Sequence, residues 1–199
     1  MTALLQPGFA DPVRDTQRCF RAVLDALSHP GRIARLSDAA APILAVPILA
    51  VPISAAAAAV ALTLVDHETP LWLDAGAAAA RDWLAFHCGA PMAAGPADCA
   101  FAVTLSLPEL GLFSAGTHEA PETSATIVCQ VTAFETGRAF RLTGPGLREP
   151  ATLIVDGLPH DFAARWAKNH ALFPCGIDLI LCAGDRLTAL PRTVAIEEV

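Results

Sequence analysis

The stretch IDLILCAGDRLTAL, which runs from Ile177 to Leu190, predicts a buried β-hairpin. Most residues of 177–182 and 187–190 are apolar, and the turn Ala183-Gly184-Asp185 lies between the two runs. Short apolar runs on either side of a glycine-containing turn are typical of two antiparallel strands within a sheet. We therefore expect the sheet to finish in this antiparallel pair.

Further strands and helices alternate along the chain before this hairpin. Apolar runs predict strands at 71–73, 100–105, 126–131 and 139–143, with Gly137-Arg138 in the turn before the last of them. Helical spacing and capping signals predict helices at 12–28, 54–64, 77–87 and 159–170. We therefore expect an α/β fold, with three α/β/α layers and a mixed sheet that ends in an antiparallel pair.

The composition is that of a single folded domain. The chain has 199 residues, of which 54% are hydrophobic, and its formal net charge is −7. We expect one domain over 1–199, because no change of composition marks a boundary. An acidic chain lacks the basic surface that non-specific binding to nucleic acid needs.

Residues 39–60 form an apolar segment rich in proline and alanine that contains the repeat ILAVP-ILAVP. No charged residue occurs between Ala39 and Val65, which is long enough to span a bilayer. However, Pro42, Pro47 and Pro52 interrupt any helix in its first half. We expect an apolar loop followed by a buried helix, and a cytoplasmic protein with reduced thiols and no membrane span.

Local sequence signatures predict neither a catalytic centre nor a metal site. The cysteines form no C-x-x-C pair, and the histidines show no ligand spacing. Arg141, Gly144 and Gly146 follow a strand, where glycine amides and an arginine can bind a phosphate, although a structural turn explains the same residues. His87 and Glu122 are further candidates for the surroundings of such a ligand site.

Several segments taken together resemble the PhnH family, which belongs to the bacterial carbon–phosphorus lyase system of phosphonate catabolism. The resemblance runs in order through these segments: Asp15–Arg21, Leu62–Trp72, Phe86–Pro91, Gly116–Glu122, Arg141–Gly146, Phe173–Leu181 and Leu190–Thr193. The departure from the family pattern is at 39–60, where the ILAVP doublet resembles a local expansion.

The resemblance implies a minimal version of the fold of pyridoxal-phosphate-dependent transferases, without the cofactor site. Lys168, the only lysine, lies in a predicted amphipathic helix. The resemblance further implies a core complex with PhnG, PhnI and PhnJ, and a homodimer when the subunit is isolated. In that system a phosphonate displaces adenine from ribose C1′ of ATP, giving a ribose 1-phosphonate 5-triphosphate, and a radical enzyme then breaks the carbon–phosphorus bond. The family assigns these steps to PhnI and PhnJ.

We therefore expect a non-catalytic, supporting subunit that needs no cofactor of its own. Three alternatives stay open. In the first, the chain is a subunit with its own nucleotide or phosphonate site around Arg141–Gly146. In the second it is a pyridoxal-phosphate enzyme that uses Lys168, and in the third a stand-alone dimer unrelated to phosphonates.

Overall fold

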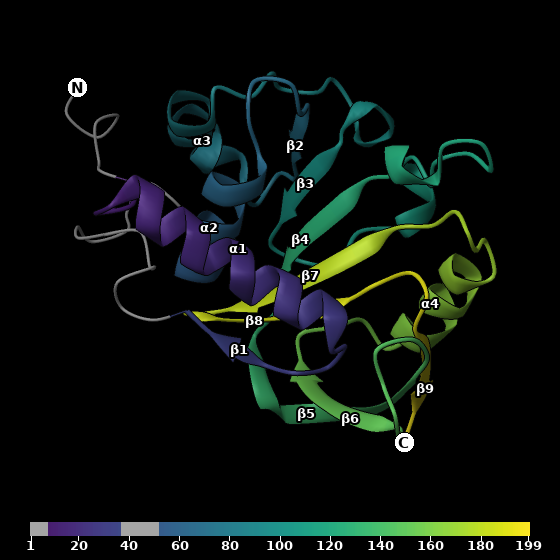
Figure 1. Cartoon of the computed structure of the whole chain (residues 1–199). Helices are drawn as coiled ribbons and strands as arrows, with labels where there is room; N and C mark the ends of the chain where they lie inside the picture. The colour runs from purple at the N-terminus through teal and green to yellow at the C-terminus, as the bar shows by residue number, and fades with distance from the viewer. Residues whose placement is uncertain (1–7, 37–51) are drawn as a thin grey trace.

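A mixed six-stranded sheet forms the centre of the molecule in the computed structural model, which describes residues 8–36 and 52–199 (Figure 1). Its strands follow the order β1-β8-β7-β4-β3-β2. Their bounds are β1 Ala34–Arg35, β2 Leu71–Leu73, β3 Phe101–Thr104, β4 Thr126–Gln130, β7 Asp178–Ala183 and β8 Arg186–Leu190. β2, β3, β4 and β7 are parallel, whereas β8 is antiparallel to both β7 and β1. The prediction of a mixed sheet that contains an antiparallel pair is confirmed.

The hairpin predicted at Ile177–Leu190 is present in the middle of this sheet. Leu179 pairs with Leu190 and Ala183 with Arg186, so the turn lies at Gly184 and Asp185. Gly184 has a φ of +59°, a left-handed conformation that suits glycine in a tight turn. The turn residues therefore fix the register that buries both strands.

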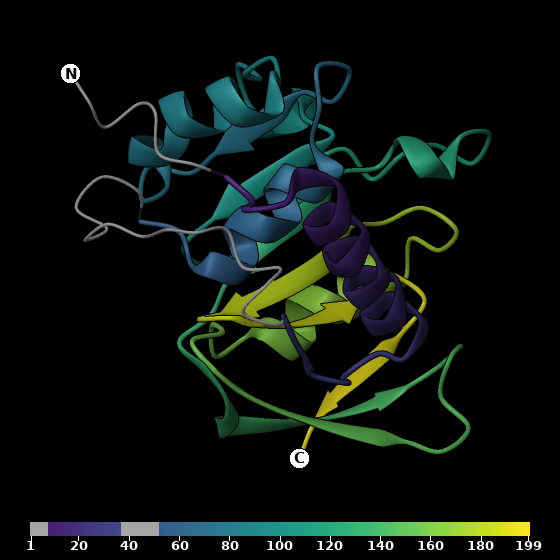
Figure 2. The same cartoon turned by 60° about the vertical axis from the view of Figure 1, so that its left-hand side comes forward.

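One face of the sheet is covered by three helices, α1 Pro12–Ser28, α2 Ala55–Leu64 and α3 Arg81–Cys88 (Figures 1 and 2). The Asp11 side chain accepts a hydrogen bond from the Arg14 amide at 3.1 Å and so caps α1. Ser54 caps α2 in the same way, accepting from the Ala57 amide at 3.3 Å. The predicted helix at 77–87 consists of a short 3₁₀ turn, Ala78–Ala80, that leads into α3.

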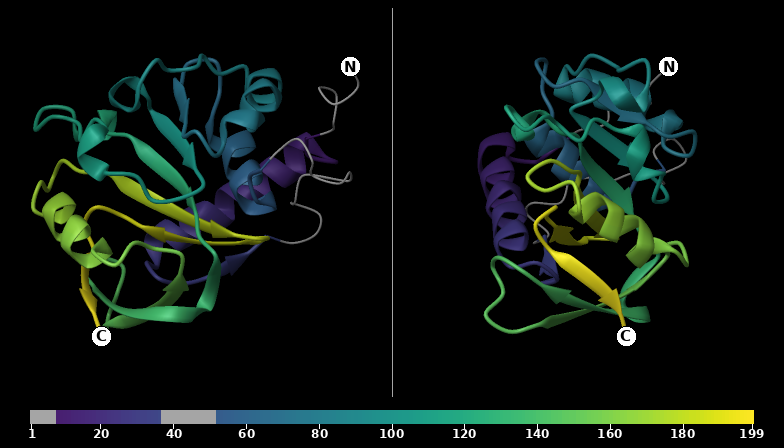
Figure 3. Two further views of the ribbon diagram at one scale, coloured as in Figure 1. Left: turned by 180° about the vertical axis from the view of Figure 1, so that it is seen from behind. Right: turned by 90° about the vertical axis from the view of Figure 1, so that its right-hand side faces the viewer.

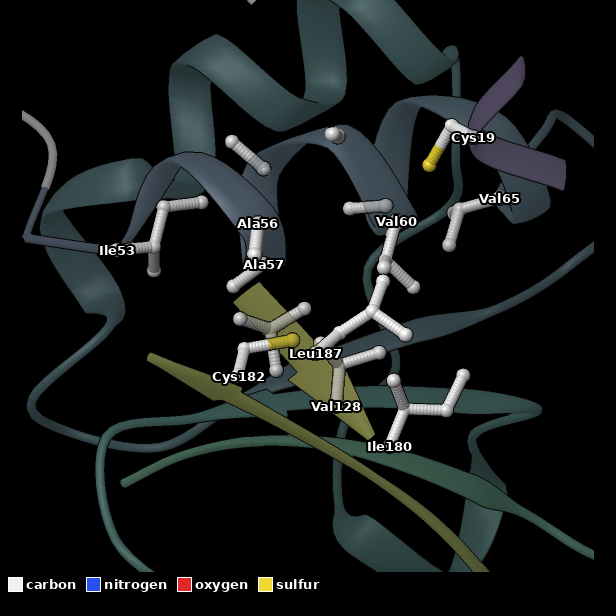
Figure 4. Close-up of a cluster of buried hydrophobic side chains, with 14 of the residues drawn as sticks. Cys19, Ile53, Ala56, Ala57, Val60, Val65, Val128, Ile180, Cys182 and Leu187 are labelled. Carbon is white, nitrogen blue, oxygen red and sulfur yellow. The ribbon is translucent and has the colours of Figure 1, made fainter. Parts of the chain in front are cut away.

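The alanine-rich sequence of α2 suits its place against the sheet. Every residue from Ala56 to Ala61 is buried, and α1 packs on α2 as well. In the close-up of this core, Val60 of α2 lies near Val128 and Ile180 of the sheet (Figure 4). Because the helix is buried on all sides, its residues are apolar all round. Their small side chains let the helix backbone approach its neighbours closely.

The opposite face of the sheet is covered by one helix and a second, smaller sheet (Figure 3). The helix is α4 Phe162–His170, and the small antiparallel sheet has the order β6-β5-β9, with bounds β5 Ala133–Thr143, β6 Ala151–Asp156 and β9 Ala195–Glu198. Phe162 of α4 packs edge-on against Phe140 of β5, with ring centroids 5.2 Å apart. The expectation of helices alone in this outer layer is therefore corrected, because β strands share the layer with α4.

The expected turn at Gly137-Arg138 is also wrong, because both residues lie inside β5. Phe134 and Arg138 both pair with Val155 of β6, so the residues between them bulge out of the ladder. A Cβ atom at Gly137 would lie 2.8 Å from Cα of Asp156, so glycine is needed where the strands approach at this bulge. Gly137 therefore marks a bulge inside a strand and not the turn before one.

The apolar segment predicted at 39–60 lies partly outside the described residues, which resume at Pro52. From Ser54 onward the prediction of a buried helix is confirmed by α2. Among the described residues, no helix is both long and apolar enough to cross a membrane.

Candidate functional site

An arginine–carboxylate pair marks the amino end of β7. Asp178 is the first residue of β7, and its Oδ1 accepts a hydrogen bond from the Arg192 amide at 2.8 Å. The Arg192 side chain donates from Nη2 to Asp178 Oδ2 at 2.5 Å and from Nε to Oδ1 at 3.2 Å. The two side chains are 14% and 21% exposed. A forked ion pair so well shielded from water fixes the segment after β8 against the start of β7.

The same arginine also binds two other parts of the chain. Its Nη1 donates to the carbonyl oxygen of Pro121 at 2.7 Å. The Arg192 carbonyl oxygen lies 2.9 Å from Nδ1 of His170, at the end of α4. We call this group (Pro121, His170, Asp178 and Arg192) the Arg192 corner. It joins segments that are far apart in the sequence.

Hydrogen bonds to the backbone and close backbone packing hold the loops beside the Arg192 corner together. The buried Asn169 side chain donates to the Ile177 carbonyl at 2.9 Å and accepts from the Ile177 amide at 2.7 Å. The Gly176 amide donates to the Ala115 carbonyl at 2.8 Å. At Gly116, φ is +76°, and a Cβ atom would lie 2.7 Å from the Pro121 carbonyl oxygen. The chain therefore needs glycine at this position for so close an approach.

A cleft opens next to the corner, between α4 and the segment around the 3₁₀ turn Leu110–Leu112. We call it the α4 cleft, and its volume is about 390 Å³. Its walls are mainly apolar and include Leu110, Phe113, Leu172 and Ile177. A concave, largely apolar hollow of this size is able to accept a small ligand or a side chain of another protein.

Charged groups line one side of the α4 cleft. Arg165 makes ion pairs with Glu109 at 2.7 Å and with Asp161 at 2.8 Å. The hydrogen bond from Arg165 lowers the pKa of Asp161, so this carboxylate stays ionised at neutral pH. Lys168 also lines the cleft and is exposed, and it makes no salt bridge with any residue that the structure describes. Of the residues that line the cleft, Arg165 and Lys168 are cationic and Glu109 is anionic, while Asp161 lies outside the lining.

Apolar side chains are exposed at the edge of the α4 cleft. Leu172, which lines the cleft, is 48% exposed, and its neighbour Phe173 is 59% exposed. Leu112, next to the lining residue Gly111, is 55% exposed. Large apolar side chains that gather around a hollow mark a surface suited to another molecule.

The candidate residues from the sequence lie on different parts of the fold. Glu122 is exposed in the 3₁₀ turn Pro121–Thr123, directly after the carbonyl that Arg192 binds. His87 lies in the last turn of α3, in the layer on the other face of the sheet, where its ring is 4.7 Å from that of Trp83. The structure therefore does not bring these two residues together.

Arg141, Gly144 and Gly146 belong to the small sheet and its turn. Arg141 is exposed on β5, opposite Thr152 of β6 and Glu197 of β9. A Cβ atom at Gly146 would lie 2.3 Å from the carbonyl oxygen of Ser28, and one at Gly144 would lie 2.9 Å from that of Thr193. Close backbone packing thus accounts for both glycines, and anion binding by this turn stays a prediction.

Burial makes most of the thiols poor nucleophiles. All six cysteines are free. Burial raises the pKa of Cys88 and of Cys129 to about 12 and that of Cys99 to about 11. These side chains are therefore protonated at neutral pH, and a thiol attacks far less readily than a thiolate. Within the described ranges, no three His, Cys, Asp or Glu side chains form a group able to hold a metal ion.

The residues that organise this site were largely missed by sequence reasoning. Asp178 lies in the predicted hairpin, but the hairpin pattern does not name the residue that its carboxylate binds, which is Arg192. Arg192, Asn169 and Arg165 carry no local signal, because their partners lie elsewhere in the sequence. Only the family segments Gly116–Glu122, Phe173–Leu181 and Leu190–Thr193, which contain Pro121, Asp178 and Arg192, pointed to this region.

Fold and site together describe a mixed α/β domain with a closed ion-pair network beside an open apolar cleft. The model of the PhnH family, described as bacterial phosphonate metabolism protein, matches residues 7–197. The chain therefore belongs to the PhnH family, which confirms the resemblance seen in the sequence.

Two relatives are similar over nearly their whole length. The chain is 41% identical to the alpha-D-ribose 1-methylphosphonate 5-triphosphate synthase subunit PhnH of Rhizobium meliloti (strain 1021), over 96% of this chain and 94% of that protein. It is 32% identical to the HtxG protein of Stutzerimonas stutzeri, whose name refers to a C-P lyase subunit, over 90% of this chain and 85% of that protein.

Proposed function

We propose that this chain is a subunit of an assembly that makes ribose 1-phosphonate 5-triphosphates from ATP and alkylphosphonates, with release of adenine. The observation that carries the proposal is the 41% identity, over 96% of the chain, to a relative named as a subunit of the corresponding synthase. Because the match extends almost from end to end, the whole domain and not a shared module supports the assignment.

Within this assembly the chain acts as a supporting subunit without catalytic side chains. The carboxylate and guanidinium at the Arg192 corner are bound to each other and to backbone groups, so they are poorly placed to bind a substrate or move a proton. The buried thiols are protonated. By contrast, Leu112, Leu172 and Phe173 present apolar surface to solvent, which favours docking to another protein.

The partners that we propose are PhnG, PhnI and PhnJ, with a homodimer when the chain is isolated, in the cytoplasm. PhnI and PhnJ then provide the displacement at ribose C1′ and the radical step. Apolar surface around the α4 cleft supports contacts of this kind, since interfaces of stable complexes bury apolar cores.

We further propose that the fold is a reduced form of the pyridoxal-phosphate-dependent transferase fold, without the cofactor site. Lys168 supports this, because it is exposed on α4, whereas Schiff-base lysines are activated by desolvation or by a neighbouring cation. Adding pyridoxal phosphate should therefore produce no internal-aldimine absorbance. A band that disappears in Lys168→Ala would contradict this part of the proposal.

Co-purification tests the proposed function. The chain, carrying an affinity tag, is expressed with and without the other subunits of the system from the same organism. We expect a stable complex in fixed stoichiometry, and we expect phosphonate-dependent adenine release to fall when the chain is omitted. A chain that purifies alone, and whose omission leaves adenine release unchanged, would refute the proposal.

A further inference from the structure

The α4 cleft has the features of a pocket that receives a side chain from another protein. Leu110, Phe113, Leu172 and Ile177 form its apolar walls within a volume of about 390 Å³. Interface hot spots are commonly large side chains that insert into well-packed pockets of this kind. The hollow is large enough for a small ligand or for a protein side chain, and the residues around it distinguish the two.

The surroundings favour a protein. Phe173 and Leu112 are more than half exposed, next to lining residues of the cleft. A small ligand within the cleft leaves such side chains in water, whereas a protein surface laid over the cleft also buries them. The combination of a pocket and an apolar rim therefore fits a docking surface.

The charge of the lining defines the kind of partner. The cleft is lined by Arg165 and Lys168, against the single carboxylate of Glu109, on a chain whose formal net charge is −7. Arg165 is already paired with Glu109 and Asp161, whereas Lys168 makes no salt bridge with any described residue. A carboxylate of the partner is the complementary group for Lys168.

The walls of the cleft are held rigidly before any partner arrives. Asn169 fixes the end of α4 to Ile177 through two hydrogen bonds, and Gly176 binds Ala115 through the backbone. The Arg192–Asp178 pair anchors the adjacent loops. A preformed pocket loses little conformational entropy on binding, which increases affinity.

We propose that the α4 cleft is where another subunit of the assembly docks, through a segment that inserts one apolar side chain and places a neighbouring carboxylate against Lys168. The inference rests on the proposed function and extends it by naming the surface and the chemistry of the partner segment. The proposed occupant is a different subunit, and self-association through the cleft is the outcome that would refute the inference.

The test compares substitutions in the cleft with matched substitutions elsewhere. Lys168→Glu reverses the proposed contact charge, and Leu172→Asp places a carboxylate in the apolar wall. Leu24→Asp on α1 is the control for Leu172→Asp, since the two leucines are 46% and 48% exposed. Arg148→Glu, in the exposed loop between β5 and β6, is the control for charge reversal. Thermal melts first establish that all variants are folded.

Each protein is titrated against the assembly of the other subunits, purified from cells that lack this chain, by surface-based or calorimetric binding. We expect Lys168→Glu and Leu172→Asp each to raise Kd by about tenfold or more, and both controls to stay within about twofold of wild type. The Lys168→Glu effect should shrink at high salt.

The outcomes separate the two proposals. If the wild-type chain does not bind the assembly, the proposed function fails. If it binds and all variants bind equally, or if the controls lose affinity to the same degree, the docking surface lies elsewhere and only this inference fails. If the cleft variants change self-association of the isolated chain in sedimentation, and not binding to the assembly, a second copy is the occupant and the inference is refuted.

Discussion

Replacing Arg192 tests the claim that the Arg192 corner is a structural anchor. In Arg192→Ala, Asp178 keeps the hydrogen bond from the backbone amide at 2.8 Å but loses the two side-chain donors. The Pro121 carbonyl loses its donor as well. Hydrogen bonds to charged groups contribute about 1.5–3 kcal/mol each, and water reaches part of this site because the two side chains are 14% and 21% exposed.

With that partial exposure taken into account, we expect Arg192→Ala to lower the free energy of unfolding by about 2–3 kcal/mol, and Tm by about 5–10 °C. Arg192→Lys keeps the charge but not the fork, so it should lose about half as much. The assay is urea denaturation at neutral pH, followed by tryptophan fluorescence and circular dichroism, with thermal melts in parallel.

Arg14→Ala is the matched control. Its ion pair with Asp11 is 3.6 Å long, and the Arg14 side chain is 77% exposed, so its removal should leave stability within experimental error of wild type. A double-mutant cycle of Arg192→Ala with Asp178→Asn should show a coupling energy of about 1 kcal/mol or more. If Arg192→Ala and Arg14→Ala have the same effect, the corner is not an anchor and the reasoning is refuted.

Three other predictions follow from single features. Burial raises the pKa of Cys129 to about 12 in the folded state, above the ordinary 9.0, so the stability that its protonated thiol confers is complete below pH 9 and is lost as pH rises through about 12. Between about pH 9 and pH 12 Cys129 should therefore contribute up to about 1.4 kcal/mol per pH unit to the fall in unfolding free energy, on top of the contributions of the other buried thiols, Cys88 and Cys99 among them. The slope should be smaller by about this amount in Cys129→Ala, and equal slopes in the two proteins would contradict the prediction. Gly146→Ala should cost about 2 kcal/mol or more, because its Cβ would meet the Ser28 carbonyl at 2.3 Å, whereas Gly111→Ala, with no atom within 4 Å, should stay within about 0.5 kcal/mol in the same melts. Finally, ATP should leave the Tm of the isolated chain within about 1 °C; a concentration-dependent rise that Arg141→Ala abolishes would instead support a phosphate site.

Local patterns predicted most elements of the fold. The start signal Asp11-Pro12 located α1, the alanine-rich run from Ser54 located α2, and the glycine turn at Gly184 located the central hairpin. These signals work because they lie within a few residues of the structure that they specify.

The small sheet was the main omission, for a physical reason. β6 follows β5 only after residues 144–150, and β9 pairs with β5 although β6, α4, β7 and β8 lie between them in the sequence, so no two-residue turn marks either pairing. Gly137 was interpreted as a turn residue, although its role is to permit a bulge inside β5. A glycine has the same appearance in the sequence in both situations.

The candidate site was still less visible than the fold. The ion pair of Arg192 with Asp178 joins residues whose proximity depends on the strand order of the finished sheet. Similarly, the α4 cleft exists only because α4 lies beside the segment around Leu110. Such long-range contacts leave no periodic trace, and only the family segments indicated that this region mattered.

The most direct test of the account is an adenine-release assay with ATP and methylphosphonate. We expect no release by the isolated chain, reduced release by the other subunits without it, and full release when the chain is added back. Release by the isolated chain at a rate comparable to that of the complete assembly would contradict the claim that this subunit acts through docking and not through chemistry of its own.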